Sequence, residues 1–172
     1  MDKEPQQLAE EGKRAFASGN YAEAARLFEE AARGFALAQD ELNAAEMNNN
    51  RSVSLLKDDQ PQQALDAAAG TERIFESHAD AKRQAMAFGN QAAALEALKR
   101  YDEAVKLYER AAELFEQAGE KELRALVVKS VAACRLKQGK VSDAGMEMLG
   151  ALGAVEKPSL FQRILRFFLR LR

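Results

Sequence analysis

The sequence predicts an all-α protein, a right-handed superhelical solenoid of four antiparallel helix pairs followed by an amphipathic C-terminal helix. Two observations lead to this prediction. Apolar residues recur three and four positions apart through most of the 172 residues, which is typical of helices buried on one face, and strand-like alternation of Val, Ile or Thr is missing. In addition, the segment GNYAEAARLFEEAARGF, which begins at Gly19, returns as KRYDEAVKLYERAAELF, which begins at Lys99.

The two segments begin 80 residues apart, and a search at half of this interval finds two weaker copies of the same pattern, so the period is about 40 residues. One phase holds Tyr21, Pro61, Tyr101 and Val141, and another holds Ala24, Ala64, Ala104 and Ala144. Four repeats therefore fill residues 1–156, with expected bounds of about 1–38, 39–78, 79–118 and 119–156, and residues 157–172 form a separate segment. A further column of small residues, Ala31, Ala111 and Ala151, is interrupted by Thr71 in repeat 2.

Each repeat is expected to divide into two helices, because turn-forming residues recur between the apolar runs. Within the repeats these breaks fall at Gly19-Asn20, Asp58–Pro61, Lys99-Arg100 and Gly139-Lys140. Between the repeats they fall at Gln39-Asp40, Ala79-Asp80 and Gly119-Glu120. Pro61 suits the first turn of a helix, where its missing N–H has no partner in any case.

The repeat resembles the tetratricopeptide repeat family, whose motif combines a small residue in the first helix with a Gly-Asp/Asn-Tyr turn and an Ala, an aromatic and an Ala in the second. Repeat 1 carries Gly12, Gly19-Asn20-Tyr21, Ala24, Phe28 and Ala31, and repeat 3 carries Ala92, Tyr101, Ala104, Tyr108 and Ala111. Repeat 3 has Lys-Arg at the turn, and repeats 2 and 4 are degenerate. The period exceeds the usual value of about 34 residues, so the resemblance is to long-helix members such as kinesin light chains. HEAT and armadillo repeats are the rival architecture, and the Gly-Asn-Tyr turn favours the tetratricopeptide repeat.

The resemblance implies that the first helices of the pairs line a concave surface that binds peptides or proteins. Three consecutive asparagines, Asn48–Asn50, lie in the first helix of repeat 2, where asparagine is a poor helix former. In long-helix members, asparagines at this phase hydrogen-bond the backbone of a bound peptide, and this implication carries to Asn50 and to Asn90, which holds the same phase in repeat 3. The alternative for these residues is a solvated helix face or a hydrogen bond between helices. The remaining residues expected on or beside the same surface are Asn49, Lys57, Lys129 and Lys137. Lysines there favour an acidic partner.

Catalytic and metal chemistry have little support in the sequence. The single histidine, His78, lies in a break, and the single cysteine, Cys134, lies on an apolar face where a buried thiol is expected. Asp58-Asp59 lack the further oxygen ligands that a calcium site requires. We therefore expect neither enzymatic activity nor a cofactor. The polar, acidic start of the chain does not resemble a signal peptide, and the lone cysteine fits a reducing compartment, so the expected location is the cytoplasm.

Charge is divided unevenly along the chain. The net charge is −2, and residues 157–172 contain five basic residues and no acid, so residues 1–156 sum to −2 − 5 = −7. An acidic body argues against nucleic acid as a partner. The basic segment would form a helix of about 21 Å, which is shorter than the roughly 30 Å hydrocarbon core of a bilayer.

Three interpretations of this basic segment are open. It could cap the last repeat, bind an anionic membrane surface from the cytoplasm, or dock on its own or a neighbouring copy and so produce a homo-oligomer. On a helical wheel its arginines fall in one arc of about 100 degrees and apolar residues fill the rest. The residues expected to carry the capping or membrane role are Leu160, Phe161, Arg163, Ile164, Leu165, Arg166, Phe168, Leu169 and Arg170.

Overall fold

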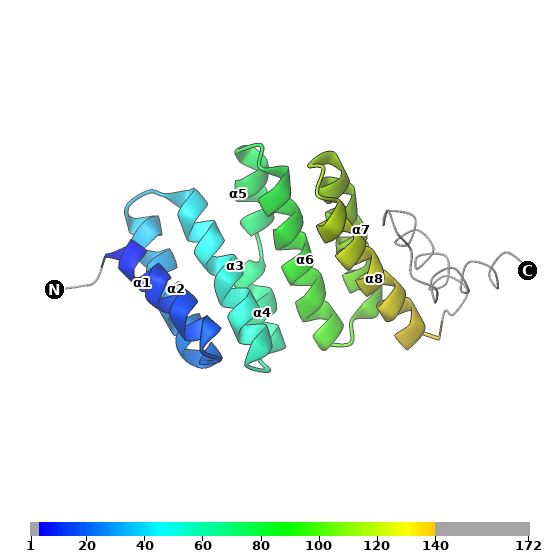
Figure 1. Cartoon of the computed structure of the whole chain (residues 1–172), viewed down its shortest axis with the longest axis horizontal. Coiled ribbons are helices and arrows are strands. Elements are labelled where there is room, and N and C mark those ends of the chain that lie inside the picture. Colours follow the sequence, from blue (N-terminus) through cyan, green and yellow to red (C-terminus); the bar gives the residue numbers. More distant parts are fainter. Residues whose placement is uncertain (1–3, 140–172) are drawn as a thin grey trace, which may run out of the picture.

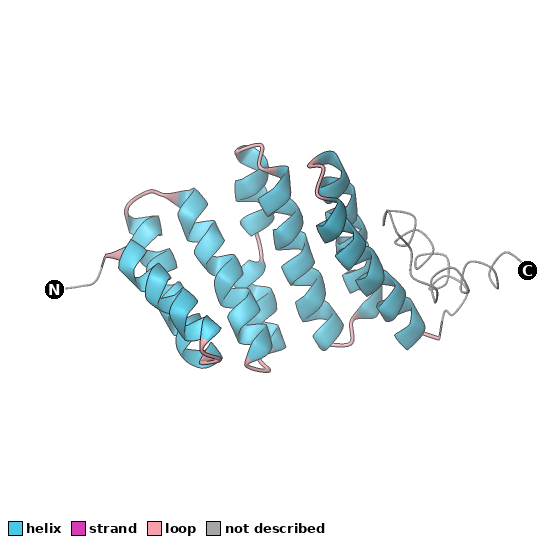
Figure 2. Cartoon of the chain, viewed as in Figure 1, coloured by secondary structure: helices cyan, strands magenta, loops and turns pink. Residues whose placement is uncertain are grey.

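The computed structural model describes residues 4–139, and this part of the chain contains eight α-helices and no strand (Figure 1 and Figure 2). The helices are α1 (Pro5–Ala17), α2 (Tyr21–Leu37), α3 (Glu41–Lys57), α4 (Pro61–Ala68), α5 (Thr71–Ser77), α6 (Ala81–Ala97), α7 (Tyr101–Gln117) and α8 (Lys121–Lys137). The predicted all-α class and helical-repeat solenoid are therefore confirmed. The second helix expected for repeat 4 and the amphipathic helix at residues 160–170 lie outside the described residues.

The helices form two layers (Figure 1). We call the outer surface of α1, α3, α6 and α8 the first-helix face, and that of α2, α4, α5 and α7 the second-helix face. Polar contacts tie the first layer together: the Arg83 guanidinium of α6 lies 3.1 Å from the Glu46 carboxylate of α3. At the other side of α6, the Lys137 ammonium of α8 lies 2.8 Å from the Glu96 carboxylate. Successive pairs therefore stack as a one-dimensional array.

The turns recur at equal intervals along the chain and share one backbone geometry. A residue with positive φ ends each of the helices α1, α2, α3, α5, α6, α7 and α8, and these residues are Gly19, Gln39, Asp59, Ala79, Lys99, Gly119 and Gly139. At the first six turns the N–H of the following residue donates to the carbonyl five positions earlier, at 2.8–2.9 Å, as in a Schellman motif. That following residue is also the N-cap of the next helix, so each turn connects two helices without a longer loop.

The core consists of alternating small and large side chains. Ala24, Ala64 and Ala104, one from each of repeats 1 to 3, are fully buried. Gly12 lets the Phe28 ring pack against the backbone of α1, because a Cβ at this position would come within 2.9 Å of the ring. Small residues in this way allow the aromatic of one helix to pack directly against the backbone of its partner.

The second helix of repeat 2 differs from the expectation of one continuous helix. It is split into α4 and α5, although the span Pro61–Ser77 has the same length as the unbroken α2 and α7, so no residue is inserted. At the break Ala69 is extended, with φ −60° and ψ 128°, and Gly70 is left-handed, with φ 83°. Thr71, which interrupts the alanine column in the sequence, directly follows this break. The physical reason is that Gly70 adopts a left-handed conformation that a residue with a side chain adopts only at a cost, and polar side chains bond the groups that the break frees.

Candidate functional site

Helix α3 distributes its three consecutive asparagines over three environments. Asn48 is half-buried on the second-helix side, Asn49 is buried with 7% of its surface exposed, and Asn50 is half-buried toward the first-helix face. This follows from helix geometry, because two residues along the chain correspond to a rotation of about 200 degrees. The three side chains therefore cannot contribute to one surface.

Asn49 is bonded within the protein. Its Nδ2 donates to the Thr71 hydroxyl at 3.0 Å and to the Ala45 carbonyl at 3.2 Å, and its Oδ1 accepts from Asn90 Nδ2 at 2.9 Å. The Thr71 hydroxyl in turn donates to the Ala68 carbonyl at 2.7 Å. This network joins α3, α5 and α6 around the break, which is the inter-helix alternative stated for the asparagines.

Asn50 lies on α3 and Asn90 on α6, which are neighbouring helices of the first layer. The Asn90 side chain donates a hydrogen bond to Asn49, the residue next to Asn50. Within residues 4–139, the Asn50 carboxamide forms no hydrogen bond, whereas its backbone carbonyl accepts from Ser54 Oγ at 2.8 Å. Asn90 uses Nδ2 on Asn49 and keeps its carbonyl oxygen available. Asn50 thus offers two donors and an acceptor, and Asn90 offers an acceptor.

The three lysines expected on this surface are spread over it. Lys57 ends α3 and Lys129 lies in the middle of α8; both are exposed, and neither forms an ion pair inside the described range. Lys137 is engaged, since its ammonium bonds Glu96 and lies 5.8 Å from the Tyr101 ring centroid. The hydrogen bond from Lys137 to Glu96 raises the pKa of Lys137, which stays protonated and is largely neutralised by this carboxylate.

Two apolar residues on the first-helix face were missed by the sequence reasoning. Met86 lies one turn before Asn90 on α6 with 46% of its surface exposed, and Leu126 occupies the same phase on α8 with 60% exposed. Glu46 of α3, Met86 and Leu126 are spaced by the 40-residue period, so inspection of this position in each repeat would have identified both apolar residues. Exposed large apolar side chains next to unsatisfied amide groups are typical of a binding surface.

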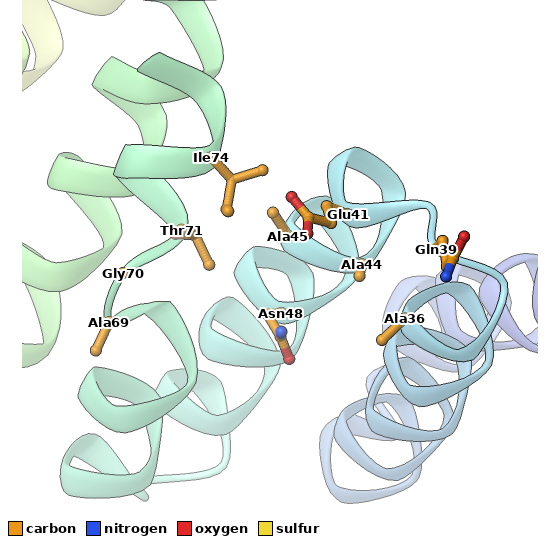
Figure 3. Close-up of a pocket in the computed structure, with 10 residues that line it drawn as sticks. All are labelled: Ala36, Gln39, Glu41, Ala44, Ala45, Asn48, Ala69, Gly70, Thr71 and Ile74. Carbon is orange, nitrogen blue, oxygen red and sulfur yellow. The ribbon is translucent and has the colours of Figure 1, made fainter. Parts of the chain in front are cut away.

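A pocket of about 710 Å³ opens on the second-helix face between the end of α2 and the α4–α5 break, with α3 as its floor (Figure 3). Figure 3 shows Ala36 and Gln39 on one side and Thr71 and Ile74 on the other. Most of its lining side chains are small, and the lining residues are Ala36, Gln39, Glu41, Ala44, Ala45, Asn48, Ala69, Gly70, Thr71 and Ile74. The sequence does not predict this pocket.

The remaining reactive groups show no arrangement for catalysis within the described part of the chain. Cys134 is fully buried, and this burial, followed by the nearby Glu96 carboxylate, raises its pKa to about 11. Burial also raises the pKa of Tyr108, whose hydroxyl donates to Glu96 at 3.0 Å. Among residues 4–139, no group of three or more His, Cys, Asp or Glu side chains is placed to hold a metal ion. The same residues include no helix that is both long and apolar enough to cross a membrane.

Comparison with known proteins agrees with this geometry. Residues 83–144 match the family model described as tetratricopeptide repeat. This part of the chain therefore has the sequence of a tetratricopeptide repeat. No curated protein matches the chain.

Solved structures share the fold. Aspartyl phosphate phosphatase F from Bacillus subtilis superposes with a TM-score of 0.76 at 20% identity, over 88% of this chain and 40% of that one. A putative kinesin light chain with nearly identical TPR-like repeats, from Podosopora anserina, gives a TM-score of 0.56 at 15% identity, over 99% of this chain and 96% of that one. The chain therefore spans less than half the length of the phosphatase, and at these identities the likeness concerns the fold.

Proposed function

We propose that this tetratricopeptide repeat protein is a non-enzymatic adaptor that binds a peptide or protein segment on its first-helix face. The observation that carries the proposal is the coincidence of two rows on one face, the apolar Met86 and Leu126 beside the amide-bearing Asn50 and Asn90. Apolar side chains of a ligand can pack on the first row while its backbone bonds the second. We also propose that the adaptor acts in the cytoplasm.

The charge of the face favours an acidic ligand. Lys57 and Lys129 are exposed and have no ion-pair partner in the described residues, whereas Glu46 and Glu96 are each paired with a cation from a neighbouring helix. A ligand carboxylate would therefore meet unpaired ammonium groups at opposite sides of α6. Because these lysines are exposed, they contribute more to the association rate and to salt dependence than to affinity.

Selection from a random phage-displayed peptide library on the full chain tests this proposal. Enriched peptides should lose binding to the Asn50→Ala and Leu126→Glu variants by about tenfold or more each, since one loses a hydrogen-bond partner and the other an apolar contact. Asn48→Ala is the matched control, because it removes the same side chain from the opposite side of α3. Enriched peptides that bind all three variants equally would rule out the first-helix face as the site.

A second candidate function is supported by the sequence of residues 157–172. In this membrane-surface recruitment module, the apolar residues of 160–171 would enter the acyl boundary and the arginines would meet anionic head groups. Co-sedimentation of the full chain, and of a version that ends at Lys157, with anionic and neutral vesicles measures this. Binding to anionic vesicles that is lost with residues 158–172 would support the module. Absence of binding would leave the adaptor as the only function proposed.

A further inference from the structure

The pocket between α2 and the α4–α5 break is separate from the proposed peptide site. Its floor on α3 consists of Glu41, Ala44, Ala45 and Asn48, which are spaced i, i+3, i+4 and i+7 and so share one stripe of the helix. Asn50 lies about 200 degrees around α3 from Asn48. A ligand in this pocket would leave the first-helix face free.

The lining of the pocket suits bulky apolar side chains. Four of its residues are alanine and one is glycine, so the space between α2 and α5 is not filled by the protein's own side chains. The hydroxyl of Thr71 is already used, because it accepts from Asn49 and donates to Ala68. The walls therefore present methyl groups and carbon beside an almost equal polar surface, to which Gln39, Glu41 and Asn48 contribute.

The charge around the pocket favours a cationic ligand. Residues 39–80 contain nine acids and three bases, a net charge of −6, against −7 for the whole of residues 1–156. Of the three bases, Arg51 is 3.4 Å from Glu29 and Lys57 lies on the far side of α3. Arg73 is exposed on α5 beside Glu72. The acidity of the chain is thus concentrated in the repeat that contains the pocket, and two of its acids, Glu46 and Asp80, are paired with Arg83 of α6.

We propose that the pocket receives the basic segment of the same chain, residues 158–172. This segment contains eight Leu, Ile or Phe residues, four arginines and no acid, so both its side-chain size and its charge complement the pocket. Eighteen residues separate Gly139 from Pro158, which is about 27 Å even if all are helical. The pocket lies along the first half of α3 and Gly139 follows the end of α8, so the linker must cross roughly two helix spacings of about 10 Å each and about 20 Å along the helix axis; an extended linker of this length spans both.

Disulfide trapping in the full chain tests the proposal. Cysteine replaces Phe161, Leu165 or Phe168 in turn, combined with Asn48→Cys in the pocket or with Asn50→Cys on the opposite side of α3. Both positions are half-buried and start from the same residue type, so they are matched. We expect the Asn48→Cys pairs to form an intramolecular disulfide at least about tenfold faster than the Asn50→Cys pairs. Equal rates would overturn the proposal, and so would a product of dimer mass, which would assign the segment to a neighbouring copy.

A second measurement does not depend on engineered cysteines. Asn48→Phe fills the pocket, and Asn50→Phe adds the same side chain on the other side of α3. We expect trypsin to cleave after Arg163 and Arg166 about tenfold faster in Asn48→Phe than in the wild-type chain, and at the wild-type rate in Asn50→Phe. Cleavage at one rate in all three proteins would overturn the proposal. Wild-type binding to anionic vesicles through residues 158–172, unchanged by Asn48→Phe, would do the same and would favour the membrane candidate.

Discussion

Single residues decide how each helix of this array ends. Seven residues at equal spacing along the chain adopt positive φ, and only three of them are glycine. Gln39, Asp59, Ala79 and Lys99 hold the same conformation with a side chain, which costs about 1–2 kcal/mol relative to the right-handed region. The Schellman hydrogen bonds and the packing of the following helix keep these residues in place. Replacing one of these four residues by glycine should therefore increase the free energy of unfolding without changing any contact between side chains.

Ala79→Gly is predicted to stabilise the protein. Ala79 has φ 54°, and glycine removes the Cβ strain while adding some entropy to the unfolded chain, so the net gain should be about 0.5–1 kcal/mol. Thermal unfolding should show a rise in Tm of about 1–4 °C. Gly19→Ala is the reverse control, because Gly19 has φ 79° and open space around it. A lower Tm for Ala79→Gly would contradict this account.

Neighbouring asparagines on α3 should respond differently to truncation. Asn49→Ala removes the acceptor of the Asn90 amide and the donor to the Thr71 hydroxyl, and should cost about 1–3 kcal/mol in the free energy of unfolding. Asn50→Ala should change that free energy by less than about 0.5 kcal/mol, because no internal bond is lost. Urea denaturation of the two variants measures both values. Equal losses would mean that Asn50 also has a structural role.

Cys134 should be unreactive in the folded protein. Its thiol is fully buried, and its pKa of about 11 lies above the unfolded value near 8.5–9. Because the folded pKa is raised, this contribution to stability is complete below about pH 8.5 and is lost as the pH rises toward 11. At pH 8.5, alkylation by iodoacetamide should be about a hundredfold slower than in the denatured chain. Alkylation at comparable rates would show that α8 opens readily.

At the scale of elements, the broken helix of repeat 2 distinguishes this array from four equal pairs. Helix α5 has seven residues, too few for stability in isolation, and depends on its contacts with α3 and α6. Phe75 supplies the main apolar contact, with 1% of its surface exposed and the Arg83 guanidinium 5.4 Å from its ring centroid. Gln91 from α6 donates to the Ala68 carbonyl at 3.2 Å and to Glu72 at 2.7 Å. Side chains of neighbouring helices thus replace the missing helical hydrogen bonds.

Gly70→Ala should loosen α5 selectively. Gly70 has φ 83° and nothing within 4 Å of the position a Cβ would take, so the cost is conformational and about 1 kcal/mol. Hydrogen exchange should accelerate in residues 69–80 before other helices are affected. Gly119→Ala, at φ 74° with equally open surroundings, is the control that should leave this exchange unchanged. Equal effects of the two substitutions on α5 would show that the break is not an independent weak point.

The sequence predicts these elements to different degrees. The repeat phase and the turn residues predict the positions of the helix ends, because breaks and apolar periodicity are local properties. The split of α4 and α5 is not predicted, since the run of alanines before Gly70 has high helix propensity. Gly70 and Thr71, the exception in an alanine column, were the signals of it. The pocket could not be predicted, because it results from the spacing of α2 and α5 over α3.

At the scale of the molecule, the described core is strongest at its two sides. One buried cluster contains Phe28 and Phe35 and joins α1, α2 and α3, and another contains Tyr108, Leu114 and Phe115 and joins α6, α7 and α8. Between them lie two smaller clusters rich in alanine. Four of the five buried polar residues in residues 4–139 belong to repeat 2, namely Asn49, Ser52, Ser54 and Thr71. Among repeats 1 to 3, repeat 2 therefore buries the fewest large apolar side chains.

A substitution that destabilises the cluster of α6, α7 and α8 should consequently have only a partial effect on the cluster of α1, α2 and α3. Phe115→Ala removes a large side chain that is 3% exposed and should cost about 3–5 kcal/mol. Because each repeat contacts only its neighbours, hydrogen exchange should accelerate strongly in α6, α7 and α8 and much less in α1 and α2. Phe28→Ala, at a site that is 2% exposed, should produce the opposite distribution. Equal acceleration of both sides in both variants would show that the alanine-rich clusters of repeat 2 couple the array into one cooperative unit.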